Sequence, residues 1–362
     1  GVGALILKPL EKAMNDGDNI YGVIKGSAVN QDGRTKGITA PSMLSQKNLI
    51  YQAYKKSSIN PETISYVEAH GTGTKLGDPI EVKALNEAFS MFTDRKHFCV
   101  LGSHKPNFGH TIMTAGIAGV FKILMGMKYK KIPPTISVED INEHIDLNNS
   151  PFYINTHLQD WKRNDGIPLR AGVSSFGFSG TNCHMIIEEP PSKTKKENSK
   201  RHPFLFPFSA KTKTALRQKL IYMNEWLDRE SDNISIQDIS YTLLVGRKHF
   251  TNRCIIIASD LKELKDKIEQ VLHNEVNDDY FDNTNRDFST IDGVTKNTIE
   301  ADYILDKLNK SNIDKDEYKE YLTTLARLYT NNHEINWTKL FVEDACYRVS
   351  MPGYPFDKES YW

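Results

Sequence analysis

The segment from Ile64 to Glu81, ISYVEAHGTGTKLGDPIE, constrains the fold more than any other part of this chain. Its apolar start predicts a buried strand, and His70 stands where that strand ends. The loop Gly71–Thr74 alternates glycine with threonine, and its glycines would let a ligand approach the backbone closely. A histidine at the carboxyl end of a strand is a typical site position in α/β proteins. Such a residue can also be a satisfied structural one.

A helix is expected directly after this loop, at the residues GDPIE. Asp78 is predicted as its N-cap, Pro79 suits the first helical position, and Glu81 is the expected capping-box partner. The segment therefore predicts strand, loop and helix in that order.

A second segment, GSHKPNFGH, leads into an apolar helix predicted over Ile112–Lys128, whose small residues would let it pack closely against other backbone. His110 stands just before this helix, where the helix dipole disfavours a charged imidazole. A neutral histidine with a fixed N–H donor could stabilise an oxyanion or enolate, and Lys105 would add a cation. A capped buried helix beside a solvated lysine explains the same residues.

A third segment, VSSFGFSGTNCHMIIEE, predicts a glycine-hinged loop followed by an apolar strand. Its loop, with Gly177 and Gly180, could offer backbone N–H groups to an oxyanion. A plain hairpin would use similar residues, so this segment alone does not decide between a site and a turn.

Charge and cysteine usage narrow the function classes. The 362 residues include 46 Lys and Arg and 46 Asp and Glu, which gives no electrostatic reason to expect nucleic acid or an anionic membrane as partner. The cysteines are far apart, so neither a zinc site nor a disulfide framework is expected, and no metal ligands are predicted. They are Cys99, Cys183, Cys254 and Cys346.

No targeting or membrane segment is expected. The start of the chain has no basic n-region, so a signal peptide is not predicted. The apolar segment Ile112–Lys128 is interpreted as too short and too interrupted for a membrane span. We therefore expect a cytoplasmic location.

The lysine-rich stretch PPSKTKKENSKRH predicts a linker between two regions. The expected divisions are a first domain over 1–190, a linker over 191–202, an α/β domain over 203–345 and an extended tail over 346–362. In the second region we predict strands at 204–210 and 253–259, helices at 211–230, 236–245, 260–272 and 314–329, and an irregular loop at 274–292.

Taken in order, EAHGTGTKLGDPIE, GSHKPNFGHTIMTAGIAG and SSFGFSGTNCHMIIEE resemble the C-terminal signature blocks of the β-ketoacyl synthases, specifically the ketosynthase domains of modular polyketide synthases. The stretches VNQDG and GITAP resemble the block that the family places just before them. The resemblance covers about residues 1–190. It implies the second half of a thiolase-like αβαβα sandwich, followed by a small α/β linker domain.

The resemblance also implies a mechanism, in which a carrier-bound malonyl-type extender is decarboxylated and its carbanion attacks an acyl thioester. The histidines would promote decarboxylation and stabilise the enolate oxygen, beside the site lysine. Two threonines would hold the phosphopantetheine arm, which arrives on an acyl carrier protein, and a gating phenylalanine would lend its N–H to the oxyanion hole. No other cofactor is implied. These residues are His70, His110, Lys105, Thr72, Thr74 and Phe178.

The family's nucleophilic cysteine block has no match here, and the resemblance places it upstream of Gly1. We therefore expect the chain to act with an upstream ketosynthase half that bears this cysteine, in a homodimer. Departures near the site are expected to change specificity and rate rather than reaction class. They are His104, Pro106, Phe108, Ser179 and the run Ile112–Thr114.

Residues 203–362 resemble the linker domain that follows a ketosynthase, through PFSAK, GRKHF, INW and YPF. No GxSxG serine elbow is found, which points to the branch served by a free-standing, trans-acting acyltransferase. The linker domain could be a spacer or a docking platform for that enzyme. A non-condensing, acyl-transferring ketosynthase or a scaffold also remains open, although the presence of His70 favours condensation.

Overall fold

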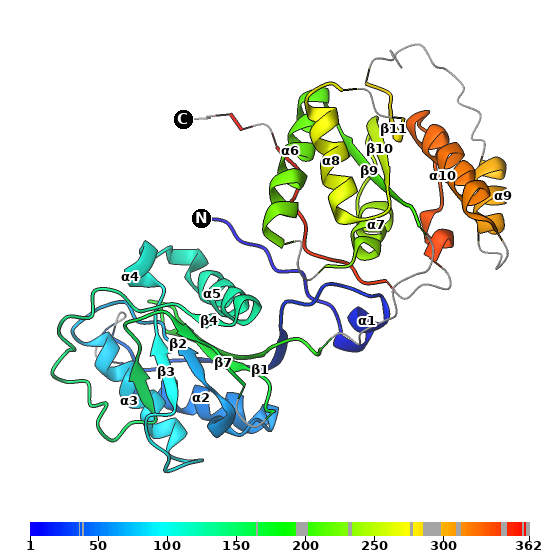
Figure 1. The fold of residues 1–362 in the computed structure, drawn as a ribbon. Coiled ribbons are helices and arrows are strands. Elements are labelled where there is room, and N and C mark those ends of the chain that lie inside the picture. Colours follow the sequence, from blue (N-terminus) through cyan, green and yellow to red (C-terminus); the bar gives the residue numbers. More distant parts are fainter. Residues whose placement is uncertain are drawn as a thin grey trace. The chain divides into compact units, whose positions relative to one another are not determined.

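The computed structural model describes residues 1–35, 37, 40–163, 166–192, 202–230, 234–275, 278–284, 298–308, 313–341, 346–356 and 358–359. The chain divides into two compact units (Figure 1). One comprises Gly1–Leu10 with Ile20–Lys193, and the other Glu11–Asn19 with Thr194–Trp362. The short helix α1 (Leu10–Asn15) falls at this division.

A six-stranded sheet of order β1-β8-β7-β2-β3-β5 forms the centre of the first unit. The strands β7, β2, β3 and β5 are parallel, whereas β8 runs antiparallel to its neighbours β1 and β7. The bounds are β1 (Val23–Gln31), β2 (Tyr66–Glu68), β3 (Cys99–Gly102), β5 (Phe152–Ile154), β7 (Arg170–Phe176) and β8 (Thr181–Glu188). The register sets Glu68 opposite both Gly102 and Val173, so the carboxyl ends of these three parallel strands lie along the same edge of the sheet.

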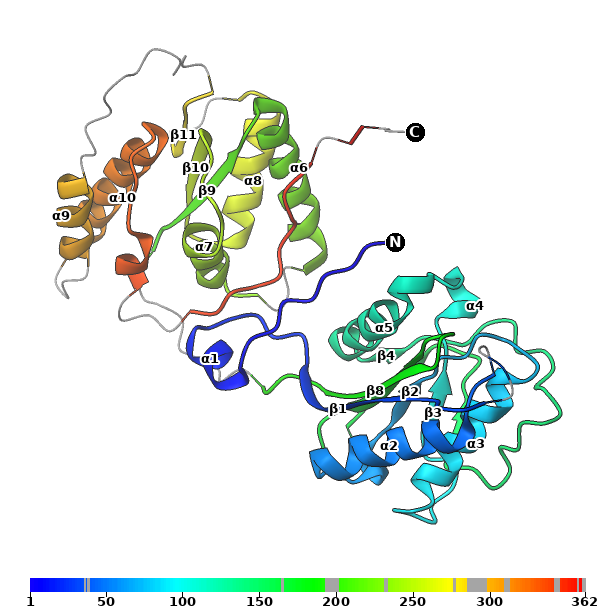
Figure 2. The same ribbon diagram turned by 180° about the vertical axis from the view of Figure 1, so that it is seen from behind.

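Helices cover both faces of this sheet, which is why its central strands are apolar (Figures 1 and 2). The helices α2 (Met43–Ser57) and α3 (Gly77–Phe89) pack on one face, and α5 (Ala115–Tyr129) packs on the other. The shorter elements are η1 (Pro61–Thr63), α4 (Lys105–Phe108), η2 (Ile112–Thr114) and the strand pair β4 (Lys131–Ile132) with β6 (Gln159–Asp160).

Small residues let α5 approach the sheet, as its sequence predicted. A Cβ atom at Gly119 would lie 3.1 Å from both the Cγ of Glu68 and a methyl carbon of Val173, and one at Gly126 would lie 2.9 Å from the Lys131 carbonyl oxygen. Among the apolar residues of this helix, Phe121 and Met125 are exposed. Ile117 and Leu124 are half-buried, because Gly3 lies against Ile117 and Gly22 lies against Leu124.

The predicted helix at 112–128 begins as the 3-10 turn η2 and continues as α5. By length and composition alone, the segment Ile112–Tyr129 is long and apolar enough to cross a membrane, so the expectation that it is too short was wrong. Its buried residues pack against Tyr66, Val173 and their neighbours, as a core helix does. Residues 1–9 form no ladder within the described chain.

The second unit is built on a three-stranded antiparallel sheet of order β11-β10-β9. Its strands are β9 (Phe204–Ala210), β10 (Asn252–Ala258) and β11 (Tyr280–Asp282). Its helices are α6 (Lys213–Glu230), α7 (Ile236–Val245), α8 (Leu261–Leu272), α9 (Thr298–Leu308) and α10 (Lys315–Thr330), with the turn η4 (Trp337–Phe341). The predicted strands and helices match these bounds within a few residues, but β11 lies inside the segment 274–292 that was expected to be a loop.

The described part of the tail, 346–356, packs within the second unit. The backbone N–H of Val349 donates to the Thr242 hydroxyl at 3.0 Å, and that of Arg348 donates to the Gly17 carbonyl at 2.8 Å. That the tail packs back on the ketosynthase region stays a prediction.

Truncating Phe89 should destabilise the first unit strongly. Its ring is fully buried between Tyr54 and Phe152, with centroids 5.3 and 4.8 Å away. Because a cavity would remain, Phe89→Ala should lower the free energy of unfolding by about 3–5 kcal/mol in urea denaturation. The control Leu44→Ala, at a residue 61% exposed on α2, should change it by less than about 1 kcal/mol. Equal effects of the two substitutions would contradict this packing.

Candidate active site

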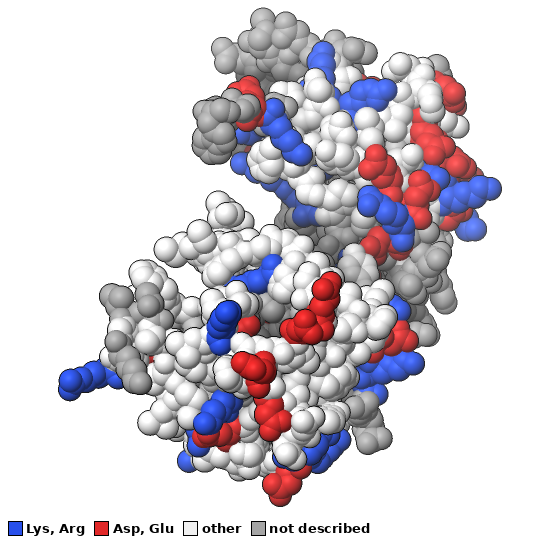
Figure 3. Space-filling view, turned by 90° about the vertical axis from the view of Figure 1, so that its left-hand side faces the viewer, with Lys and Arg blue, Asp and Glu red and all other residues white. Residues whose placement is uncertain are grey.

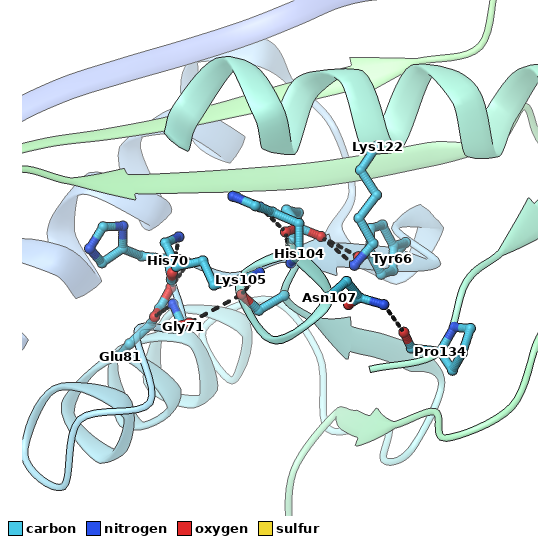
Figure 4. Close-up of polar contacts among 11 residues, drawn as sticks. Tyr66, His70, Gly71, Glu81, His104, Lys105, Asn107, Lys122 and Pro134 are labelled. Atoms are coloured by element: carbon cyan, nitrogen blue, oxygen red, sulfur yellow. Dashed lines mark hydrogen bonds and ion pairs between the residues drawn. The ribbon is translucent and has the colours of Figure 1, made fainter. Parts of the chain in front are cut away.

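The three segments singled out in the sequence meet where the parallel strands end. His70 follows β2 by two residues, Lys105 follows β3 and begins α4, and Phe176 ends β7. His110 stands between α4 and η2. Figure 4 shows His70 and Lys105 side by side, with Glu81 reaching them from α3. Residues scattered over more than a hundred positions therefore form one cluster.

The backbone and side chain of His70 are held at three atoms. The Nδ1 atom accepts a hydrogen bond from the Phe176 backbone N–H at 3.3 Å. The His70 N–H donates to Glu81 at 2.7 Å, and the carbonyl oxygen accepts from the Lys105 ammonium. Because Nδ1 is an acceptor, the ring proton lies on Nε2, which is then a donor.

Burial, together with the nearby charges of Lys105, His110 and His104, lowers the pKa of His70 to about 3. The imidazole is therefore neutral at physiological pH. A neutral ring with its proton on Nε2 can donate one hydrogen bond to a developing negative charge without itself carrying charge.

His110 has the same arrangement. Its Nδ1 accepts from the backbone N–H of Ile112 at 3.0 Å, so its proton also lies on Nε2. Burial lowers its pKa, aided by the charge of Lys105. The two imidazole centroids lie 5.8 Å apart with the rings at 84°. The site thus holds two neutral imidazole donors close together.

Lys105 is buried, with 8% of the residue exposed. Burial lowers the pKa of its ammonium, although the carboxylates of Glu81, Glu68 and Asp78 oppose that shift. Its bond to the His70 carbonyl makes it a support for the histidine in this structure.

The loop after His70 is held by side chains that were predicted to cap the next helix. Asp78 accepts from the Gly73 N–H at 3.1 Å, and Glu81 accepts from the N–H groups of His70 and Gly71. The predicted N-cap and capping box are therefore wrong. The helix begins at Gly77, whose N–H donates to the Thr74 hydroxyl at 3.0 Å. Burial raises the pKa of Glu81 to about 7, against the effect of the two N–H groups.

The remaining predicted residues lie nearer the surface. The Thr72 hydroxyl is 3.4 Å from that of Thr74. Phe178 is 75% exposed, in the turn between β7 and β8 that the bond from the Gly177 N–H to the Thr181 carbonyl closes at 2.7 Å. This segment is thus the hairpin that was left open as the alternative, with β7 before the turn and the predicted apolar strand after it as β8.

Sequence reasoning missed the carboxylate behind the site. Glu68 is fully buried at the end of β2, where His104, Tyr66 and Lys122 surround it. The signal was present, because a glutamate inside the apolar run ISYVEA must find partners when it is buried.

On the face drawn in Figure 3, basic and acidic side chains are interspersed.

Two protein families match successive parts of this chain. Residues 21–139 match the family "Beta-ketoacyl synthase, C-terminal domain", and residues 142–256 match "Ketoacyl-synthetase C-terminal extension". Polyketide synthase PksL of Bacillus subtilis is 42% identical over the whole chain, and ThaG of Burkholderia thailandensis is 35% identical. The chain spans only 8% and 6% of the length of these two relatives.

Solved structures agree with these relatives. The ketosynthase from module 6 of the bacillaene synthase of Bacillus subtilis 168 superimposes with a TM-score of 0.84 at 39% identity, over 98% of this chain and 60% of that one. A module 1 ketosynthase from Bacillus amyloliquefaciens gives 0.83 at 34% identity, over 97% and 59%. The expected thiolase-like α/β fold is thereby confirmed.

His70 should make the chain acid-sensitive in a defined window. An unfolded histidine binds a proton below pH 6.5, whereas folded His70 does so only near pH 3, so its contribution to stability is full above pH 6.5 and declines as the pH falls. Between pH 6.5 and 5, wild type should lose up to about 2 kcal/mol of unfolding free energy more than His70→Gln, measured by urea denaturation. Parallel losses in the two proteins would contradict a neutral, buried His70.

Proposed function

Since this chain belongs to the ketosynthases of polyketide synthases, we propose that it supplies the histidine-bearing part of a site for decarboxylative Claisen condensation. The observation that carries the proposal is the pair of neutral imidazoles, each with Nδ1 occupied as an acceptor and Nε2 left as a donor. Two such donors suit an oxygen that becomes negative during the reaction.

In the proposed reaction, the bond between the malonyl α-carbon and its carboxylate breaks, carbon dioxide leaves, and the electron pair moves onto the thioester oxygen as an enolate. The Nε2–H groups of His70 and His110 stabilise that oxygen. The enolate carbon then attacks the acyl thioester on a cysteine, a carbon–carbon bond forms, and the cysteine thiolate leaves. The cysteine is supplied by an upstream ketosynthase half.

Exposed apolar side chains beside the site support a partner of this kind. Ile112 and Met113 are 73% and 94% exposed, and Phe108 is 58% exposed. Large apolar side chains gathered on one surface are typical of a surface that another segment covers. We propose that the cysteine-bearing half covers them, within a homodimer.

The extender and acyl chain are proposed to arrive on acyl carrier proteins through a phosphopantetheine arm, with Thr72 and Thr74 beside its path and Phe178 at the entrance. The two hydroxyls lie on the loop directly after His70. Docking of a trans-acting acyltransferase on the second unit, and a cytoplasmic location, stay predictions.

The chain would be combined with its cysteine-bearing half and with acyl- and malonyl-loaded carrier proteins, and carrier-bound product followed by intact-protein mass spectrometry. His70→Ala should lower condensation by about 100-fold or more, because one oxyanion donor is lost. Acylation of the cysteine should persist. The matched control is His144→Ala, an exposed histidine whose side chain is 72% exposed, and it should condense like wild type.

Acylation without condensation in the wild-type protein would refute the proposal. It would favour the alternative of a non-condensing, acyl-transferring ketosynthase. Condensation that survives in His70→Ala would instead refute the role given to that histidine.

A further inference from the structure

We propose that His104 is a positioning residue. By donating hydrogen bonds to the Glu68 carboxylate, it keeps the Lys105 ammonium hydrogen-bonded to the carbonyl oxygen of His70. The consequence for catalysis rests on the proposed condensing function, but the placement of Lys105 does not. The hydrogen bonds of His104 go to Glu68, so its effect would pass through Lys105 and His70.

The Glu68 carboxylate is buried, and polar groups surround both of its oxygen atoms. Its Oε1 atom accepts from both the backbone N–H and the Nδ1–H of His104, each at 2.7 Å. Its Oε2 atom accepts from the Tyr66 hydroxyl and pairs with the Lys122 ammonium at 3.0 Å. Burial alone would raise the pKa of Glu68, but the His104 bond and the Lys122 charge outweigh it, and the pKa lies below its ordinary value.

An ionised carboxylate offers about four lone-pair positions. Three hydrogen bonds, two of them from His104, and the ion pair with Lys122 already surround the Glu68 carboxylate. Lys105 is next to His104 in the chain and feels the charge of Glu68. Because these groups surround the carboxylate, the Lys105 ammonium donates to the His70 carbonyl instead (Figure 4).

The pocket around His104 suits this single task. The ring stacks on Phe108 with centroids 5.0 Å apart and planes at 27°, and the residue is 1% exposed. Gly119 leaves room for the Glu68 side chain that the ring contacts, since a Cβ there would lie 3.1 Å from the Glu68 Cγ. Within the part of the chain that the structure describes, Nε2 has no hydrogen-bond partner. The ring therefore acts through Nδ1–H alone.

Loss of this ring would leave an acceptor on a buried carboxylate unsatisfied, which is unfavourable. The flexible Lys105 side chain is a neighbouring cation that could satisfy it. The His70 carbonyl would then lose its donor, and the histidine its fixed position. A small misplacement of a reacting group can lower a rate by about 100-fold.

The test compares His104→Leu, which removes the donor, with His104→Asn, whose side-chain amide can place an N–H near the position of Nδ1. Crystal structures of the chain with its cysteine-bearing half would locate the Lys105 ammonium. We expect it on Glu68 in His104→Leu and on the His70 carbonyl in His104→Asn and wild type. Decarboxylation of malonyl carrier protein should fall about 10- to 100-fold in His104→Leu and recover to within about threefold of wild type in His104→Asn.

Tyr66→Phe provides a second route if His104→Leu does not fold, because it frees a position on Oε2 without touching His104. Lys105 should again turn toward Glu68. Lys105 remaining on the His70 carbonyl in both donor-deleted variants would overturn the proposal, and so would equal rates in His104→Leu and His104→Asn. If wild type fails to condense at all, the proposed function fails, while the crystal structures still decide the position of Lys105.

Discussion

The parallel pairing of β2 with both β3 and β7 is the constraint on which the rest of the site depends. It sets Glu68 opposite Gly102 and Val173, so the chain leaves the sheet at three adjacent points on one edge. Backbone groups beyond a strand end have lost their ladder partners and must find others. The side chains that supply these partners, Glu81 and Lys105, are the ones that hold the backbone of His70.

The acidic and basic side chains at this edge have a different role from the imidazoles. The carboxyl group of Glu81 and the ammonium of Lys105 bond to the backbone of the loop that carries His70. The imidazoles of His70 and His110 are neutral and keep their Nε2 donors available. The energetics of burial explain this difference. A buried charge is tolerated only when it is paired or hydrogen-bonded, whereas a neutral imidazole can keep an N–H available until a reactant binds.

The predicted helix cap was wrong for a physical reason. Asp78 and Glu81 stand where local rules place a capping box, yet they accept from N–H groups of the preceding loop. A carboxylate bonds to whichever donors the fold brings near it, and here the tight loop brought donors from five to eleven residues away. The helices α2 and α9 were also missed.

The sequence by itself determined the kinds of residue at the site, their order and the elements that carry them. His70 after an apolar strand and His110 before a small-residue helix are local patterns, and local patterns survive in the fold. Only the tertiary structure decided which imidazole nitrogen of His70 carries the proton and which oxygen Lys105 contacts. The donor to His70 Nδ1 is 106 residues away, and the acceptor of Lys105 is 35 residues away. Partners so distant are chosen by strand register and helix packing, which no local pattern encodes.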